Sequence, residues 1–195
     1  MKNKPIIILG AGGHAKVLLD MLLNQKVKII GILDTSPRVI DNLYDIPIIG
    51  TDNDIVKFDP NEIELVNGIG SIGVVNVRCE VYKKFKSQGY HFRQVIHNQS
   101  IISSRVKLGE GIQVMAGAIV NAGSCIEENA IINTRTSVDH DCHIGSHVHI
   151  AHGSSLSGNV NIGSATLIGA GSAVINDIPN NVKAYGVPAR VIKKG

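Results

Sequence analysis

The sequence contains no tryptophan, and aromatic residues make up only 4% of its 195 positions. It therefore offers no aromatic platform on which the bases of a single-stranded nucleic acid could stack. The sequence also has little excess of one charge over the other. It contains 19 Lys and Arg residues and 16 Asp and Glu residues, which gives a net charge of +3. This balance gives no strongly basic surface, and we expect no nucleic-acid partner.

Long apolar runs and paired cysteines are missing as well. The most apolar opening run, Pro5 to Leu9, is too short for a membrane span or for the core of a signal peptide. The three cysteines, Cys79, Cys125 and Cys142, include no CxxC pair and favour reduced thiols over a disulfide framework. We therefore expect a cytoplasmic protein without membrane insertion.

Glycine is abundant instead, with 21 residues, and the second half of the chain repeats every six positions. One position of this repeat is aliphatic fourteen times in succession, from Ile96 to Val174, and a small or branched residue follows each of these four positions later. Two positions in six are thus expected to face an interior. Short parallel strands stacked about 4.8 Å apart produce such a pattern, whereas a helix or a simple alternation does not.

The position directly after the aliphatic residue favours turn residues. They are Gly109, Asn121, Asn133, Asp139, Gly145, Gly163 and Gly169. Such residues tolerate turn geometry or positive φ, so each six is expected to form a short strand and a corner. The repeat resembles that of the hexapeptide-repeat acyltransferases, which implies a left-handed parallel β-helix with three hexapeptides per coil, here over residues 93–195.

The sequence before the repeat predicts a small α/β domain over residues 1–92, with a parallel Rossmann-like sheet. Strands are expected at residues 5–9, 28–33 and 65–69, and helices at 17–23 and 74–87. A G-x-G-x-x-A turn at Gly10, Gly12 and Ala15 follows the first strand, and Asp34 ends the second. This pattern favours a phosphate-bearing nucleotide over a purely structural turn. A dehydrogenase is disfavoured, because about ninety residues leave no room for both halves of a dinucleotide site.

Five of the eight histidines cluster in a short stretch of the repeat: His140, His143, His147, His149 and His152. A metal site is a weaker interpretation, because no tight tetrahedral ligand motif is present. A neutral imidazole can act as general base, with Asp141 or Asp139 fixing its tautomer, and we assign this role to His140. We read His143, His147 and His152 as solvent-facing, and Cys142 as an inward residue whose hidden sulfur makes it a poor nucleophile.

A second resemblance covers nearly the whole chain. It is to the bacterial nucleotide-sugar acetyltransferases, which include relatives of the sialic-acid O-acetyltransferases. In the first domain it implies that the turn, a strand-end acid and an Ile-Gly step bind the nucleotide sugar. These residues are Gly10, Gly12, Gly13, His14, Asp34, Ile69 and Gly70.

In the β-helix the same resemblance rests on Asn133-Thr134 and on His140-Asp141-Cys142. It implies that His140 is the base and Asp141 its partner, where the family often carries the longer Glu. The residues implied to contact the coenzyme are Asn133, His149, Gly158, Gly169, Ala170 and Pro188. The implied reaction is acetyl transfer from acetyl-CoA to the amino group of a nucleotide-linked aminosugar, without a metal, in a homotrimer with active sites between subunits. Two alternatives stay open, a sugar O-acetyltransferase and a non-enzymatic nucleotide-binding scaffold.

Overall fold

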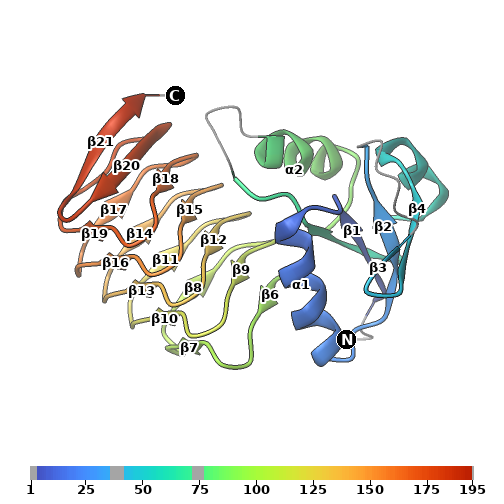
Figure 1. Ribbon diagram of the computed structural model, residues 1–195, viewed down its shortest axis with the longest axis horizontal. Helices are drawn as coiled ribbons and strands as arrows, with labels where there is room; N and C mark the ends of the chain where they lie inside the picture. The colour runs from blue at the N-terminus through green and yellow to red at the C-terminus, as the bar shows by residue number, and fades with distance from the viewer. Residues whose placement is uncertain (1–3, 36–41, 72–76, 195) are drawn as a thin grey trace. The chain divides into compact units, whose positions relative to one another are not determined.

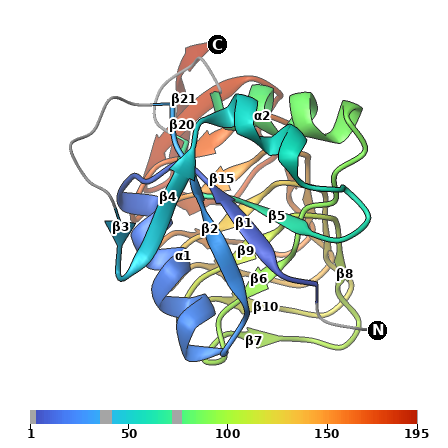
Figure 2. The ribbon, with the colours of Figure 1, turned by 90° about the vertical axis from the view of Figure 1, so that its right-hand side faces the viewer.

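The computed structural model describes residues 4–35, 42–71 and 77–194 (Figure 1). The chain forms two compact units. The first comprises Met1–Gly70 and Glu80–Val95, and the second comprises Ser71–Cys79 and Ile96–Gly195. The predicted domain boundary after residue 92 stays a prediction. The predicted fold class is confirmed: an α/β unit precedes a parallel β-helix (Figures 1 and 2).

The first unit is built on a five-stranded sheet of order β3-β4-β2-β1-β5. Its strands are β1 (Ile6–Leu9), β2 (Ile29–Leu33), β3 (Asn42–Leu43), β4 (Ile46–Gly50) and β5 (Glu64–Asn67), and its helices are α1 (Gly13–Asn24) and the 3-10 helix η1 (Asp52–Lys57). Helix α2 (Val77–Ser87) begins in the second unit and belongs to the first from Glu80 onward. All neighbouring strands are parallel except β3 and β4. Every residue of β1 is fully buried, as a continuous apolar run in a parallel sheet predicts.

Three predicted strands and the first helix of this unit are confirmed. The strand ends move by one or two residues, and the helix begins four residues earlier than predicted, at Gly13. The strand predicted to reach Ile69 ends at Asn67, and the strands and the 3-10 helix between residues 42 and 57 were not predicted. The second predicted helix is α2. Residues 74–76 of that prediction lie outside the described part of the chain.

The second unit coils through fourteen two-residue strands. They are β6 (Val95–Ile96), β7 (Ile101–Ile102), β8 (Lys107–Leu108), β9 (Gln113–Val114), β10 (Ile119–Val120), β11 (Cys125–Ile126), β12 (Ile131–Ile132), β13 (Ser137–Val138), β14 (His143–Ile144), β15 (His149–Ile150), β16 (Ser155–Leu156), β17 (Asn161–Ile162), β18 (Leu167–Ile168) and β19 (Ala173–Val174). Each strand pairs in parallel with a strand 18 residues away, as in Cys125↔His143. One coil therefore contains three hexapeptides, and the strands form three sheets.

We name each sheet by its central strand. The β13 sheet has the order β19-β16-β13-β10-β7, the β14 sheet β17-β14-β11-β8, and the β15 sheet β21-β20-β18-β15-β12-β9-β6. The last two strands, β20 (Val182–Gly186) and β21 (Ala189–Lys194), form an antiparallel hairpin that the hexapeptide pattern did not predict. Strand β20 extends the β15 sheet by pairing in parallel with β18.

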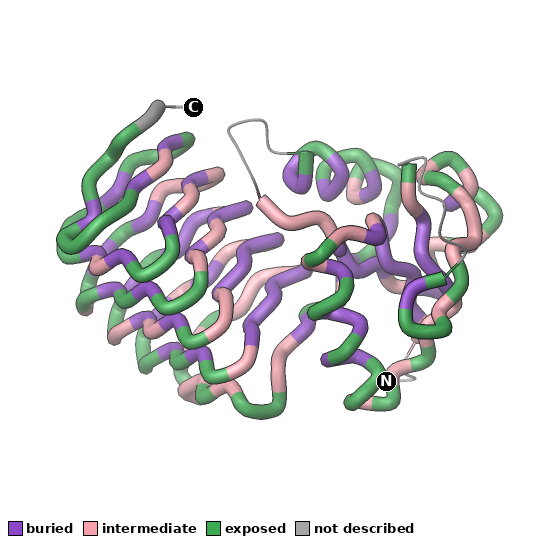
Figure 3. Tube along the Cα trace, in the orientation of Figure 1, coloured by how far each residue is buried: buried purple, intermediate pink, exposed green. Residues whose placement is uncertain are grey.

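The predicted interior column is confirmed. The aliphatic positions from Val114 to Val174 are buried, and the first three of the series are partly buried (Figure 3). The residues four positions later are buried as well, from Ile112 to Ile178. The hydroxyl groups of Ser124, Thr136, Ser154 and Thr166 donate to main-chain oxygens of the next coil, as Ser124 Oγ does to the Asp139 oxygen at 2.8 Å. Ser172 Oγ accepts a hydrogen bond from the Gly186 amide at 3.1 Å. The core therefore tolerates Ser and Thr without leaving them unsatisfied.

The corners differ from the prediction. Positive φ falls three positions after the aliphatic residue, not one. The residues concerned are Gly111, Gly117, Gly123, Asn129, Arg135, Asp141, His147, Gly153, Asn159, Ala165 and Gly171. Glycine one position after the aliphatic residue has another cause: a Cβ on Gly145 would lie 2.7 Å from the Ser164 amide nitrogen of the next coil. Close stacking of coils, and not positive φ, requires glycine there.

Candidate functional site

The glycine turn of the first unit lies where β1 ends and α1 begins. Gly10 has φ +88°, and its amide nitrogen donates to the Leu33 oxygen at 2.7 Å. Helix α1 begins at Gly13 after an N-cap at Gly12, with no side-chain cap and no acidic residue in its first turn. The amide groups at the start of α1 and the positive end of the helix dipole make this end of the sheet suitable for a phosphate group.

The other predicted residues of this unit surround the turn. The Asp34 Oδ2 atom accepts a hydrogen bond from the Ala11 amide at 2.8 Å, so Asp34 fastens the turn to the end of β2. A Cβ on Gly10 would lie 3.0 Å from Ile69 Cγ1, and one on Gly70 would lie 3.4 Å from His14 Cβ. The carboxyl ends of β1, β2 and β5 thus bring all seven predicted residues to one edge of the sheet, where ligands bind in open α/β folds.

The predicted base and acid lie together in the β-helix. His140 Nδ1 is 2.9 Å from Asp141 Oδ2, and both side chains are more than half exposed, at 61% and 63%. The hydrogen bond to Asp141 and the negative charge of Asp139 raise the pKa of His140 above its ordinary value. The shorter Asp therefore reaches the imidazole. With Nδ1 directed at the carboxylate, Nε2 is left to accept a proton.

Asp139 has a different task from Asp141. Its Oδ1 atom accepts hydrogen bonds from the His140 amide at 2.8 Å and from Asn121 Nδ2 at 3.0 Å. These two bonds lower the pKa of Asp139. Asp139 therefore fixes the backbone of the turn that carries His140, while Asp141 contacts its ring. Sequence reasoning left both acids open and missed Asn121, which lies 18 residues before Asp139.

Two residues predicted to contact the coenzyme, Asn133 and His149, are neighbours. Asn133 Nδ2 lies 3.0 Å from His149 Nε2. Burial and the positive charge of Arg78 lower the pKa of His149 to about 4, so this imidazole is neutral near pH 7. Arg78 is fully buried, and its Nε donates to the Asn129 oxygen at 3.2 Å. Sequence reasoning missed Arg78, because nothing in its local sequence marks it as buried.

The remaining histidines divide into two groups. His147 is buried, and its Nδ1 lies 3.0 Å from Asn129 Nδ2, so our reading of it as solvent-facing is wrong. His143 and His152 are exposed, as predicted. His143 Nε2 lies 3.0 Å from Glu127 Oε1, a carboxylate of the preceding coil. Cys142 is buried in the interior column and burial raises the pKa of its thiol, as its inward position predicted.

The other residues predicted to contact the coenzyme are spread over the far end of the β-helix. A Cβ on Gly158 would lie 2.6 Å from His140 Nε2, which places Gly158 beside the base. A Cβ on Gly169 would overlap the ring of Tyr185. Ala170 and Pro188 are exposed. Their contact with a coenzyme stays a prediction.

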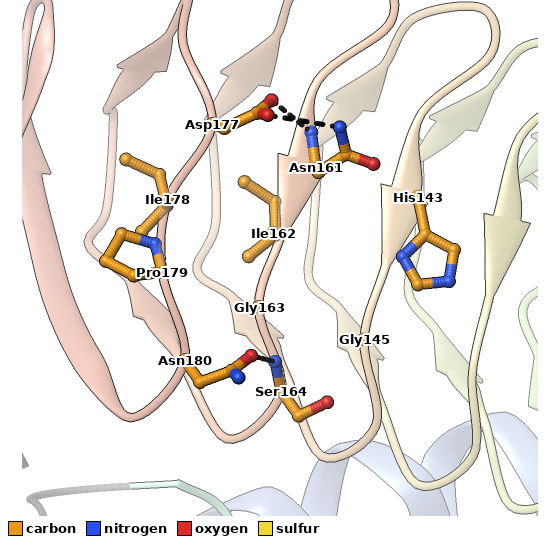
Figure 4. Close-up of a pocket in the computed structure, with 10 residues that line it drawn as sticks. All are labelled: His143, Gly145, Asn161, Ile162, Gly163, Ser164, Asp177, Ile178, Pro179 and Asn180. Atoms are coloured by element: carbon orange, nitrogen blue, oxygen red, sulfur yellow. Dashed lines mark hydrogen bonds between the residues drawn. The ribbon is translucent and has the colours of Figure 1, made fainter.

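The described surface of the β-helix has two open hollows that matter for the site. One of about 360 Å³ lies along the β13 sheet, and its lining includes Asn121, Asp139 and Ser157 beside the base. The other, of about 460 Å³, lies on the β14 sheet next to His143 (Figure 4). There Asp177 accepts hydrogen bonds from Asn161 at one end, and Asn180 accepts one from Ser164 at the other. Only the first hollow is lined by residues that hold His140.

Neither a metal cluster nor a membrane helix is found in the described residues. No group of three or more His, Cys, Asp or Glu side chains among them could hold a metal ion. None of the described helices is long and apolar enough to span a bilayer.

Comparison with known proteins gives a family match and full-length structural relatives. Residues 5–85 match the model of the PglD N-terminal domain. The acetyltransferase domain of PglB from Neisseria gonorrhoeae is 28% identical, with a TM-score of 0.83 over 97% of this chain and 100% of that one, and it has also been solved with acetyl coenzyme A. PerB from Caulobacter crescentus, solved with CoA and GDP-perosamine, is 33% identical, with a TM-score of 0.77 over 97% of both chains.

Two matches to curated proteins are short, covering 42 residues each. A putative acetyltransferase of Saccharomyces cerevisiae, YJL218W, is 55% identical over 42 residues, which are 22% of this chain and 21% of that protein. The serine acetyltransferase of Buchnera aphidicola from Acyrthosiphon pisum is 40% identical over 42 residues, 22% of this chain and 15% of that protein. The chain thus spans about a fifth or less of the length of these curated relatives.

Proposed function

The chain belongs to the PglD-type hexapeptide-repeat acetyltransferases, and we propose that it transfers the acetyl group of acetyl-CoA to the amino group of a nucleotide-linked aminosugar in glycan biosynthesis. The observation that carries this proposal is the His140–Asp141 pair at the edge of the β13-sheet hollow. A related perosamine N-acetyltransferase of known structure binds GDP-perosamine and CoA, which supports the same substrate classes here.

The proposed reaction uses His140 as general base. The amine of the sugar attacks the thioester carbonyl, and His140 Nε2 takes the proton that the nitrogen loses. Asp141 holds Nδ1–H and stabilises the imidazolium that forms, and such catalysis contributes roughly 10²–10⁴-fold. The C–S bond then breaks, and the departing thiolate takes up a proton to give free CoA and the N-acetyl sugar. Backbone amides at the coil edges would stabilise the oxyanion.

The first unit is proposed to hold the nucleotide. In this proposal the turn of Gly10–His14 binds the phosphates at the start of α1, and Asp34, Ile69 and Gly70 line the nucleoside. The bond from Ala11 to Asp34 supports this, because it fixes the turn directly before the first residue of α1. The sugar would project from the phosphates toward a general base.

We propose a homotrimer with each active site between two β-helices. The β13 sheet supports this with exposed aliphatic residues that a partner could cover: Ile101 is 66%, Ile119 37% and Ile175 54% exposed. The hollow beside His140 lies on this sheet, so a neighbouring subunit would complete a cleft for the coenzyme. Sedimentation of the fully active enzyme as a single chain would contradict this arrangement. The cytoplasmic location predicted from the sequence is kept as part of the proposal.

The proposal is tested by following thiol release from acetyl-CoA with a panel of acceptors. UDP-, dTDP- and GDP-linked aminosugars, the corresponding hydroxyl sugars and free sialic acid should be compared under identical conditions. Fast release with one nucleotide-linked aminosugar, and slow release with its hydroxyl counterpart, is the expected outcome. Fast release with sialic acid alone would replace the proposal by sugar O-acetylation. If none of the acceptors gives thiol release, a non-enzymatic scaffold is favoured.

A further inference from the structure

The turn that carries the catalytic pair is flanked by two glycines, one in each adjacent coil. Gly123 lies 18 residues before Asp141, and Gly158 lies 18 residues after His140. Since paired strands are 18 residues apart, each glycine stacks on one member of the pair. The main chain confirms this stacking, because the Asp141 amide donates to the Ala122 oxygen at 3.0 Å.

At Gly123 the carboxylate of Asp141 occupies the space that a side chain on residue 123 would take. A Cβ built on Gly123 would fall on Asp141 Oδ1, whereas the main-chain nitrogen of Asp141 would be 3.5 Å away. A methyl group there would therefore displace the end of a side chain and leave the stacking of the coils in place. The carboxylate that bonds His140 would have to turn away.

At Gly158 the missing side chain is replaced by the imidazole. A Cβ on Gly158 would lie 2.6 Å from both Cε1 and Nε2 of His140 and 3.1 Å from Cδ2. The three nearest atoms thus all belong to the ring. The ring therefore lies in space that only glycine leaves open.

We propose that Gly123 and Gly158 are positioning residues that form a slot for the catalytic pair, with Gly123 seating the Asp141 carboxylate and Gly158 seating the His140 ring. The slot explains how a side chain as short as that of Asp reaches the ring: its Oδ1 atom lies next to Gly123, and its Oδ2 atom is 2.9 Å from His140 Nδ1. The catalytic consequence rests on the proposed function, whereas the geometry does not.

The charged groups around the His140 ring allow the slot to be tested through the pKa of His140. Asp139 and Asp141, in the same turn, are the charged groups that act on His140. The residues of the two adjacent coils at this ridge carry no charge: Asn121, Ala122, Gly123, Ser157, Gly158 and Asn159. The hydrogen bond to Asp141 is the largest cause of the raised pKa of His140. Displacing the Asp141 carboxylate should therefore lower this pKa.

The first test is an NMR titration of the His140 ring in Gly123→Ala, with the signal assigned by its loss in His140→Gln. We expect the pKa of His140 to fall toward that measured in Asp141→Asn. Gly153→Ala is the matched control: Gly153 has φ +69° against +80° for Gly123, and nothing lies within 4 Å of its added Cβ. The control carries the same backbone strain and should leave the pKa of His140 unchanged. An unchanged pKa in Gly123→Ala, or an equal fall in Gly153→Ala, would overturn the proposal.

The second test is a double-mutant cycle on kcat. Gly123→Ala should lower kcat by roughly 10- to 100-fold, part of what general-base catalysis contributes, and move the acid limb of its pH profile to lower pH. In Asp141→Asn the added Gly123→Ala change should have little further effect, because both act on one contact. Additive losses would overturn the proposal. If Gly123→Ala does not fold, Gly158→Ala replaces it, because the φ of Gly158 is not in the left-handed region. This variant should lower kcat and leave the unfolding midpoint near that of wild type. An unaltered kcat in Gly158→Ala would contradict the slot.

The two tests separate this inference from the proposed function. A fall in the pKa of His140 without any acetyl transfer would leave the slot intact and remove the function. If the enzyme transfers acetyl groups but the pKa of His140 is unchanged in Gly123→Ala, the function is kept and the slot is removed.

Discussion

The two units assemble their candidate sites in different ways. In the first, Gly10, Asp34 and Ile69 follow three separate strands and meet because those strands are neighbours in one sheet. In the β-helix, the glycines that lie against Asp141 and His140 are 18 residues away, Gly123 before Asp141 and Gly158 after His140. A fixed period therefore predicts spatial neighbours in the second unit, whereas in the first only the strand order does. Substitutions can test whether this difference is also one of energetics.

The largest effect is expected from the interior column of the β-helix. Ile144→Ala removes a fully buried side chain between two stacked coils, so it should lower the free energy of unfolding by about 2–5 kcal/mol. Ile192→Ala is the control, because Ile192 belongs to the same unit but is 65% exposed and lies outside the proposed subunit interface, and it should change stability by less than about 0.5 kcal/mol. Urea unfolding measures both. Equal losses in the two variants would mean that the column does not determine the stability of the coils.

The next effect comes from the buried imidazole of His149. Its pKa is lowered from 6.5 to about 4 in the folded protein, chiefly by burial, so the unfolded state binds its proton more tightly. Stability that is complete above pH 6.5 is therefore lost as the pH falls toward 4, by up to about 3 kcal/mol.

The measurement is the difference in unfolding free energy between wild type and His149→Gln at several pH values, in which the other titrating groups cancel. Wild type should lose stability faster than the variant between pH 6.5 and 4. Parallel curves would show that His149 is not held neutral by the fold.

The smallest effect is expected at the turn of the first unit. Asp34→Ala removes the acceptor for the Ala11 amide and should destabilise the protein by about 1–2 kcal/mol. Asp34→Asn keeps an oxygen in that place, so it should preserve stability. If Asp34 also binds the nucleoside, both variants should weaken nucleotide binding measured by calorimetry. Full affinity in Asp34→Asn would restrict Asp34 to holding the turn.

Sequence predicted most where the period is strict. The interior column from Val114 to Val174 was predicted from spacing. Adjacency alone left Asp139 and Asp141 open as partners of His140, and the family resemblance implied the contact with Asp141 that the structure has. Positive φ was placed at the wrong position of the repeat, because glycine serves two purposes there. At Gly145 it permits close stacking, and at Gly123 it accepts a left-handed backbone, and composition does not distinguish them.

Sequence reasoning missed the partners that two residues, Asp34 and His147, have elsewhere in the chain. Asp34 was expected to face a ribose or base, and its bond to Ala11 became visible only once β1 and β2 were adjacent. His147 looked like one more exposed histidine, yet it is buried against Asn129, 18 residues earlier. That spacing is again one coil, so the repeat length would have identified this partner.

The central claim is that the imidazole of His140 deprotonates the attacking amine, and the rate of acetyl transfer in His140→Ala tests it most directly. With the best aminosugar of the acceptor panel at saturation, thiol release should fall by roughly 10²–10⁴-fold, while the unfolding midpoint stays that of wild type because the side chain is 61% exposed. A variant that folds normally and transfers acetyl groups at the wild-type rate would contradict the account.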